Sequence, residues 1–370
     1  MKKILCINHS CSLHGAERVF LAGIRACLSA GCGIWVAVPS GARDDGLLHE
    51  LEPLVGKDHI LRLPYKSAGG SLFRTLLVRL YNLPAVWRLS RFIRRQSMDC
   101  IYSNTSVTIA GVQTARWTGL EHFWHFHESV TPLSGWTPAL QTTYRQWIAR
   151  TRTTLLFISQ RQRREWEEAL GCRPQGHLIY NPVCLMSGKQ PPVRHTALRI
   201  GYIGRFVPLK NIPLLVEAFL RFRKRHPDSE LWLCGALDER EKTEWERRCG
   251  SGHGIRILLQ TDDAESFYRQ MDILALPSLR ETMPLVTIEA MSAGVCVIQT
   301  TQSGMSELYE DGEDCLFVAP EHAEDWENAF EACADQAFRT RLARNGQTKT
   351  LQYAFNRQFE TKIKELICVS

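Results

Sequence analysis

The chain has 370 residues, which is more than one hydrophobic core usually supports, so two domains are expected. With 44% hydrophobic and 23% charged residues, the composition is that of an ordered globular protein and excludes a disordered or low-complexity chain. A net charge of +6 without any nucleic-acid-binding motif argues against a nucleic-acid partner.

The N-terminal apolar run at residues 4–7 is too short for the hydrophobic region of a signal peptide, and it is predicted to be a strand. No run of about 18 apolar residues predicts a transmembrane helix, so we expect a cytoplasmic protein. The 13 cysteines include no Cys-x-x-Cys pair, which favours buried free thiols over disulfides or a metal site.

Short apolar runs of strand type recur along the chain, with helical patterns between them. The first half contains ILCIN, IWVAV, CIYSN, FWHFH and LLFIS, and the second half LRIGYIG, ELWLCG, IRILL, DILALPS, VCVIQ and CLFVA. Such runs, alternating with helices of ten or more residues, are typical of parallel sheets covered on both faces. The sequence therefore predicts an α/β protein with two doubly wound domains, at 1–185 and 198–350, joined by a linker at 186–197 that is rich in proline.

The two halves carry opposite charge. Residues 1–185 hold 22 Lys and Arg against 12 Asp and Glu, or +10, whereas residues 186–370 hold 23 against 27, or −4. Much of the excess lies at 72–96, where arginines interleave with apolar residues in what is predicted to be a helix. This pattern suits a helix that lies on an anionic membrane surface or binds an anionic acceptor. The alternative is an ordinary core helix with solvated arginines.

Ligands of open α/β sheets bind beyond the carboxyl ends of the strands, so residues just after the apolar runs are candidate site residues. After the first strand, Gly15 opens a predicted helix and allows close approach of an anionic ligand. After the strand in LRIGYIG, Arg205 and Lys210 lie on one loop and can hold a diphosphate.

Two glutamates lie eight residues apart in RETMPLVTIEAMSAG. Pro284 fits the first turn of a helix, which leaves Glu281 in the preceding loop and places Glu289 inside the helix. Exposed amides near Leu285 and Val286 can then receive a phosphate between the two carboxylates.

A further anion site is predicted in TTQSGMSELYEDGEDCLFV. Here Gly304 precedes a short helix that begins near Met305, and the free amides of its first turn are expected to bind an anion. The acidic residues that follow are interpreted as a solvated turn rather than as a calcium site.

Together these motifs resemble the retaining nucleotide-sugar glycosyltransferases of glycosyltransferase family 4, which have the two-domain GT-B fold. The second half resembles the family in the Glu-x7-Glu pattern of ETMPLVTIE, in GRFVPLKN and in SGMSELYEDGEDCLFV. In the first half, GAERV, YSNTS and WHFHES are similar to members that build bacterial surface polysaccharides such as lipopolysaccharide. The resemblance covers nearly the whole chain.

The resemblance implies two facing Rossmann-like domains with a cleft between them. The N-terminal domain would bind the acceptor, the C-terminal domain the nucleotide sugar, and a C-terminal helix at 351–370 would pack back on the N-terminal domain. Arg205 and Lys210 would hold the donor diphosphate and Glu289 the ribose hydroxyls.

By the same resemblance, Glu281 would bind the transferred sugar and Gly15 would approach the donor phosphates or sugar. His127, on the loop after FWHF, would bind the donor sugar and help to place the acceptor. Asn104 and Ser159 match weaker family positions.

The family also implies a UDP- or GDP-linked donor, retention at the anomeric carbon, no metal, and a glycan or lipid-linked acceptor. The family often has Glu-Gly or Glu-Ser-x-Gly where this chain has Thr282 and Met283 after Glu281, which leaves the sugar open. Two alternatives remain: a non-hydrolysing nucleotide-sugar epimerase, whose acid and base groups we do not find, and a non-catalytic glycan-binding protein.

Overall fold

The structure, a computed structural model, describes residues 1–41, 45–68, 71–130, 137–183, 185–186, 196–250, 252–261 and 263–369. By its internal contacts the chain forms two compact units, one of Met1–Pro182 with Phe355–Ser370 and one of Val183–Ala354. Most of the expected linker, residues 187–195, lies outside the described residues. Among the helices described, none combines the length and the apolar character that crossing a membrane requires.

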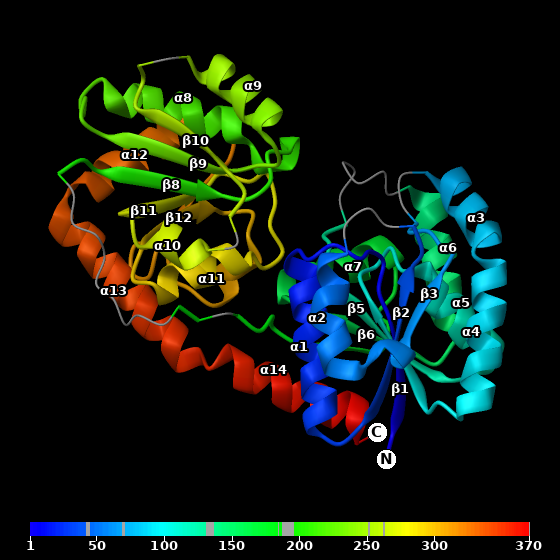
Figure 1. Ribbon diagram of the computed structural model, residues 1–370. Coiled ribbons are helices and arrows are strands. Elements are labelled where there is room, and N and C mark those ends of the chain that lie inside the picture. Colours follow the sequence, from blue (N-terminus) through cyan, green and yellow to red (C-terminus); the bar gives the residue numbers. More distant parts are fainter. Residues whose placement is uncertain are drawn as a thin grey trace. The chain divides into compact units, whose positions relative to one another are not determined.

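The first unit is built on an all-parallel sheet of seven strands in the order β3-β2-β1-β4-β5-β6-β7 (Figure 1). The strands are β1 (Lys3–Ile7), β2 (Gly33–Pro39), β3 (Ile60–Leu63), β4 (Cys100–Asn104), β5 (Glu121–Phe126), β6 (Thr153–Phe157) and β7 (Gly176–Leu178). The helices are α1 (Gly15–Ser29), α2 (Gly46–Val55), α3 (Leu72–Tyr81), α4 (Leu83–Gln96), α5 (Ile109–Thr118), α6 (Pro138–Ala149), α7 (Gln160–Leu170) and α14 (Phe355–Ile363).

All five strands predicted in this half are present, whereas β3 and β7 were not predicted. Both are edge strands, of four and three residues, and neither contains a buried residue. In contrast, β4 and β6 are buried along their whole length, because helices cover both faces of the sheet. Burial on both faces produces the continuous apolar runs from which the central strands were predicted.

The second unit contains an all-parallel sheet of six strands in the order β10-β9-β8-β11-β12-β13. Its strands are β8 (Arg199–Ile203), β9 (Glu230–Ala236), β10 (Ile255–Leu259), β11 (Ile273–Leu276), β12 (Cys296–Thr300) and β13 (Leu316–Val318). Its helices are α8 (Ile212–Arg223), α9 (Glu239–Cys249), α10 (Ala264–Tyr268), α11 (Leu285–Ser292), α12 (Ala323–Ala334) and α13 (Gln336–Tyr353). All six predicted strands are confirmed.

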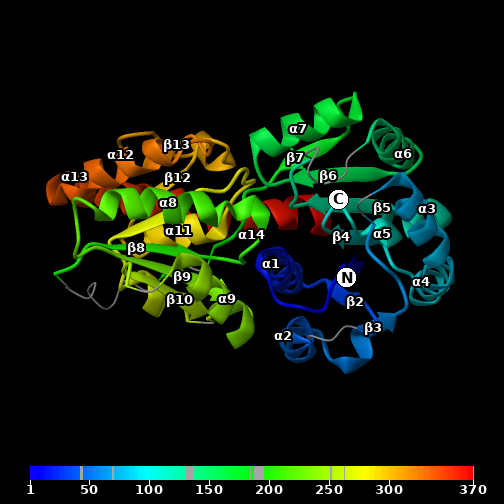
Figure 2. The ribbon, with the colours of Figure 1, turned by 90° about the horizontal axis from the view of Figure 1, so that it is seen from above.

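The single helix predicted over 72–96 is wrong, because the structure has two helices that meet at Asn82 (Figure 2). Pro84 lies in the first turn of α4, where a missing N–H costs nothing, but it cannot continue a helix from α3. The side chain of Asn82 is buried and bonds the backbone of Lys66, donating to its carbonyl oxygen (3.0 Å) and accepting from its amide (2.8 Å). The side chain of Asn82, at the break between the two helices, therefore holds the loop after β3 in place.

In each sheet the strand order reverses once, between β1 and β4 in the first unit and between β8 and β11 in the second. Loops that leave neighbouring strands at such a point diverge to opposite faces and open a crevice at the carboxyl edge. Gly15 follows β1 in the first unit, and Arg205, Lys210 and Glu281 follow β8 and β11 in the second. His127 instead follows β5, and Gly304 and Met305 follow β12.

Candidate functional site

In the second unit, Arg205 and Lys210 follow β8 at the point of reversal, as predicted. Lys210 ends a short 3-10 helix, Pro208–Lys210, whose Leu209 carbonyl accepts the Leu279 amide at 2.9 Å. The Tyr202 hydroxyl donates to the Arg205 carbonyl at 3.0 Å. The loop after β8 is thus tied to the loop after β11, while the Arg205 side chain is exposed.

Glu281, on the loop after β11, forms an ion pair with Lys210. The Lys210 Nζ to Glu281 Oε1 distance is 2.5 Å, and Ser278 Oγ donates to the same oxygen at 2.6 Å. The two charged side chains are only 27% and 11% exposed, so little water screens them from each other. Burial, and then the Glu281 carboxylate, raise the pKa of Tyr202, which keeps its hydroxyl protonated.

The Gly304 and Met305 amides, at which an anion site is predicted, both donate to groups of the protein. The Gly304 amide donates to the Glu281 carbonyl at 3.2 Å, and the Met305 amide to Ser303 Oγ at 3.2 Å. The Glu281 amide in turn donates to the Gln302 carbonyl at 2.9 Å. This segment therefore holds the backbone of Glu281 in place.

Leu285 and Val286 are the first two residues of α11, as predicted. Pro284 precedes the helix and provides no side-chain cap. Within the described part of the chain, neither of these two amides donates to another group. The uncapped N-terminus carries partial positive charge and is suited to bind an anion.

Glu289 lies inside α11, and Glu281 lies in the preceding loop, which confirms the placement predicted from Pro284. The Glu289 side chain is 5% exposed, and Tyr268, the last residue of α10, donates its hydroxyl to Oε2 at 2.9 Å. The hydrogen bond orients the carboxylate near the start of the helix.

Glycines bring β8 and β9 close together behind the Arg205 loop. Gly235 has φ of 153°, and a Cβ there would lie 1.9 Å from the Gly204 carbonyl oxygen. Only glycine fits such an approach. Nothing in the local sequence marks Gly235, because its contact is with Gly204, 31 residues earlier in the chain.

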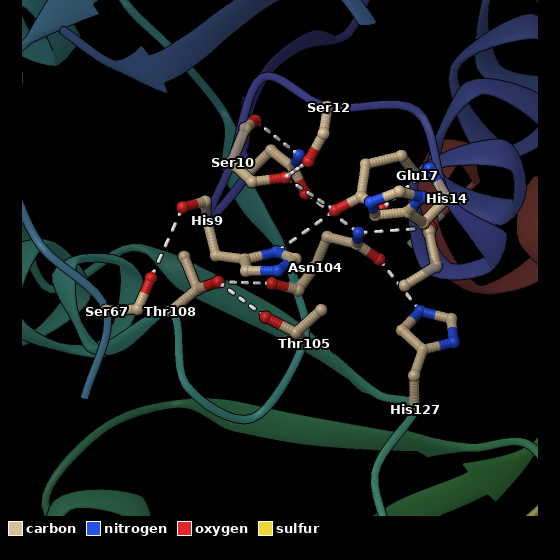
Figure 3. Close-up of polar contacts among 12 residues, drawn as sticks. His9, Ser10, Ser12, His14, Glu17, Ser67, Asn104, Thr105, Thr108 and His127 are labelled. Atoms are coloured by element: carbon tan, nitrogen blue, oxygen red, sulfur yellow. Dashed lines mark hydrogen bonds and ion pairs between the residues drawn. The ribbon is translucent and has the colours of Figure 1, made fainter. Parts of the chain in front are cut away.

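In the first unit, His127 belongs to a polar network at the β1/β4 reversal (Figure 3). His127 follows β5, and its Nε2 lies 2.8 Å from Asn104 Oδ1. Asn104 Nδ2 donates to Asn8 Oδ1 (2.8 Å) and to the Ala16 carbonyl (3.1 Å), beside Gly15, the exposed first residue of α1. Asn104 thus joins the helix start to His127.

Because the Asn104 amide nitrogen donates twice, its oxygen accepts, and His127 carries its proton on Nε2. Burial, and then the neighbouring His125, hold the pKa of His127 well below its usual value. His127 is therefore a neutral imidazole at neutral pH. The second family position, Ser159, caps α7 by accepting from the Gln162 amide at 3.1 Å.

Glu17 is a residue of this network that sequence analysis did not identify. Its carboxylate is 2% exposed, accepts from Ser10 Oγ (2.8 Å) and from the His14 amide (3.2 Å), and lies 3.3 Å from His9 Nδ1 (Figure 3). The signal was present in the sequence, since a glutamate three residues after a helix cap is typical of a capping box.

Two family models match the chain. The Glycosyltransferase Family 4 model matches residues 13–185, and the model of Glycosyl transferases group 1 matches residues 197–336. These segments correspond to most of the first and second units.

Curated relatives match over part of their length. A D-inositol 3-phosphate glycosyltransferase of Corynebacterium kroppenstedtii is 29% identical over 167 residues, covering 42% of this chain and 37% of the relative. The lipopolysaccharide core biosynthesis glycosyltransferase LpsE of Rhizobium meliloti is 32% identical over 158 residues, covering 42% and 45%. The chain thus matches less than half the length of these relatives.

Solved structures match over the whole chain. Anabaena HepE in complex with UDP and glucose superimposes with a TM-score of 0.80 at 19% identity, covering 100% of both chains. WaaG, a glycosyltransferase involved in lipopolysaccharide biosynthesis, gives a TM-score of 0.71 at 13% identity, covering 99% of both. The fold is therefore GT-B, and with a family 4 domain followed by a group 1 domain the chain belongs to the glycosyltransferases of these families.

Proposed function

We propose that this protein transfers a sugar, with retention at the anomeric carbon, from a nucleotide diphosphate sugar to a glycan or lipid-linked acceptor. The observation that carries the proposal is the carboxyl edge of the second sheet. There the Lys210–Glu281 ion pair, the nearby Arg205 loop and the uncapped start of α11 lie on loops at one reversal of strand order. Carboxylates that bind hydroxyls and cations that bind phosphates are what a nucleotide sugar requires.

On this proposal, Arg205, Lys210 and the Leu285 and Val286 amides bind the donor diphosphate. Glu289 accepts hydrogen bonds from the ribose, and Glu281, oriented by Ser278 and Lys210, binds the hydroxyls of the transferred sugar. The cations and helix amides offset the negative charge that develops on the departing diphosphate, so no metal is required.

In the first unit, we assign a role beside the reacting sugar to His127 and the start of α1 at Gly15. A neutral His127 can hydrogen-bond a sugar hydroxyl without placing a charge beside the anomeric carbon. Asn104 orients the imidazole. Retention, with the leaving phosphate taking the acceptor proton, is the family mechanism that we extend to this chain.

The donor nucleotide is proposed to be UDP or GDP, and the UDP bound by Anabaena HepE favours UDP. The acceptor is proposed to belong to bacterial surface polysaccharide synthesis, supported by the likeness to the lipopolysaccharide core enzyme LpsE. We also propose that the protein works at the inner face of the cytoplasmic membrane, in peripheral contact through residues 72–96.

The donor proposal is tested by thermal shift with a panel of nucleoside diphosphates and their sugars. One nucleotide at saturating concentration is expected to raise the melting temperature by several degrees, because a ligand at 100 times its Kd stabilises by about 2.7 kcal/mol. The shift should be lost in Glu289→Gln and Arg205→Gln and retained in Arg240→Gln, a matched change on the exposed face of α9.

Incubation of that nucleotide sugar with and without acceptor then separates the possible activities. Transfer that requires the acceptor supports the proposal, whereas an isomerised nucleotide sugar without acceptor identifies an epimerase. If no nucleotide raises the melting temperature, the proposed assignment of the donor site is wrong.

A further inference from the structure

A cavity of about 700 Å³ lies in the first unit, at the carboxyl ends of β1, β2 and β3. Its lining contains none of the residues proposed to bind the donor or the reacting sugar, although Arg74, Leu77 and Val78 belong to the proposed membrane-contact segment 72–96. Its lining is formed by three loops and one helix: residues 9–12, residues 39–41, residues 65–67, and Arg74, Leu77 and Val78 of α3.

The walls of this cavity are fixed by hydrogen bonds from buried side chains. The Tyr65 hydroxyl donates to the carbonyl oxygens of Asn8 (2.5 Å) and Ala37 (2.9 Å), which ties the loop after β3 to β1 and β2. Asn82 bonds both backbone groups of Lys66, and Ser67 Oγ donates to the His9 carbonyl at 3.2 Å. Since these bonds are internal to the protein, the cavity is preformed for a ligand.

The lining is cationic. It includes Lys66 and Arg74, both exposed, and no aspartate or glutamate. Within the described residues neither cation forms an ion pair, and the Lys66 ammonium lies 4.7 Å from the centre of the Tyr81 ring. Ser10 of the lining donates to the carboxylate of Glu17, which also accepts from the His14 amide and is not part of the lining. Two cations beside the Ser40 hydroxyl suit a ligand with several anionic oxygens.

An exposed apolar strip continues from the rim of the cavity. Leu77 lines the cavity and is 50% exposed, and on the same helix Phe73 and Leu80 are 71% and 61% exposed. Large apolar side chains gathered on one exposed helix are typical of an interaction site. A free phosphate or a soluble sugar phosphate would leave this strip uncovered, whereas a lipid chain attached to the phosphate would cover it.

We infer that the cavity binds the phosphate or diphosphate of a lipid-linked acceptor, with Lys66 and Arg74 bonding the phosphate oxygens and α3 contacting the lipid. The inference rests on the proposed function, in that it specifies the acceptor of the transfer. It names the chemical class of the acceptor as an anionic, phosphate-bearing lipid.

The test is calorimetric titration of the full chain with farnesyl diphosphate, inorganic pyrophosphate and farnesol. Farnesyl diphosphate is expected to bind most tightly. Lys66→Gln and Arg74→Gln should each weaken it by about tenfold, which is the effect of losing one charge-assisted hydrogen bond. Arg164→Gln, a matched change at an exposed position of α7 outside the cavity, should leave the affinity unchanged.

Equal loss in the Arg164 variant, or no loss in the Lys66 and Arg74 variants, would overturn the inference. Pyrophosphate binding as tightly as farnesyl diphosphate would overturn the lipid contact. The UDP thermal shift on the same variants separates this inference from the donor proposal. If UDP still raises the melting temperature but farnesyl diphosphate does not bind, the donor proposal holds and the inference about the cavity fails. If farnesyl diphosphate binds but UDP does not raise the melting temperature, the inference about the cavity holds and the donor proposal fails.

Discussion

Gly235 occupies a position on β9 where any side chain would meet the backbone of the Arg205 loop. Its φ of 153° and the 1.9 Å separation between a built Cβ and the Gly204 carbonyl oxygen impose two separate penalties on any other residue. The position of Arg205 thus depends on a residue that has no side chain.

Gly235→Ala is therefore expected to lower the free energy of unfolding of the second unit by about 2 kcal/mol or more, since strain and overlap add. The matched control is Gly312→Ala, where φ is 73° but nothing lies within 4 Å of the added Cβ. Thermal unfolding of the two variants measures the difference. Equal destabilisation would mean that the close approach to Gly204 contributes nothing.

At the scale of elements, α3 and α4 carry the basic and apolar residues of 72–96 on two short helices. Arg88, Arg91, Arg94 and Arg95 are exposed on α4, as is Trp87, whereas most of the exposed large apolar side chains of this segment lie on α3. Packing against the core explains the apolar residues on the buried face of α4. It does not explain the apolar side chains of α3 that are exposed to solvent. Among the interpretations left open by the sequence, this exposure favours the membrane surface over an ordinary core helix.

We expect the protein to cosediment with vesicles that contain anionic lipid and to remain in solution with neutral vesicles. Arg94→Gln with Arg95→Gln should weaken the partition by about 2 kcal/mol, because each cation near an anionic surface contributes about 1 kcal/mol. Phe73→Ser with Leu80→Ser should weaken it as well, while Leu351→Ser, at an exposed apolar position of α13, is the control. Binding that ignores lipid charge would contradict the proposal.

At the scale of the whole molecule, the two units differ in how they depend on pH. The centre of the first sheet buries His122 and His125, and burial lowers the pKa of each to about 3. His122 bonds the hydroxyls of Ser103 (2.9 Å) and Thr153 (3.0 Å), and the Tyr102 hydroxyl lies 2.8 Å from His125 Nδ1. Both imidazoles are neutral in the folded protein.

In the unfolded chain these histidines bind protons near pH 6.5, whereas in the folded chain they do so only near pH 3. Their contribution to stability is complete above pH 6.5 and is lost as the pH falls from 6.5 towards 3. Between these pH values the free energy of unfolding falls by up to about 1.4 kcal/mol per pH unit for each histidine. Hydrogen exchange at pH 7 and pH 5 should show β4, β5 and β6 losing protection faster than β8 and β11. Equal loss in both sheets would contradict this.

The sequence by itself determined the fold class, eleven of the thirteen strands in the described part of the chain, and the placement of Glu281 before and Glu289 within α11, because apolar runs and proline act locally. It did not predict β3 and β7, whose short half-buried segments leave no such run. It also joined α3 and α4, since the partner that fixes their break, the Lys66 backbone, lies 16 residues away.

Only the tertiary structure decided which of the candidate groups are already bonded to one another. Lys210 and Glu281 are 71 residues apart in the chain, and the Gly304 amide is bonded to the backbone of that same glutamate. The cavity in the first unit is likewise lined by loops that follow three different strands. These contacts depend on strand order, which no local pattern encodes, because it is set by how helices and sheet pack across the whole unit.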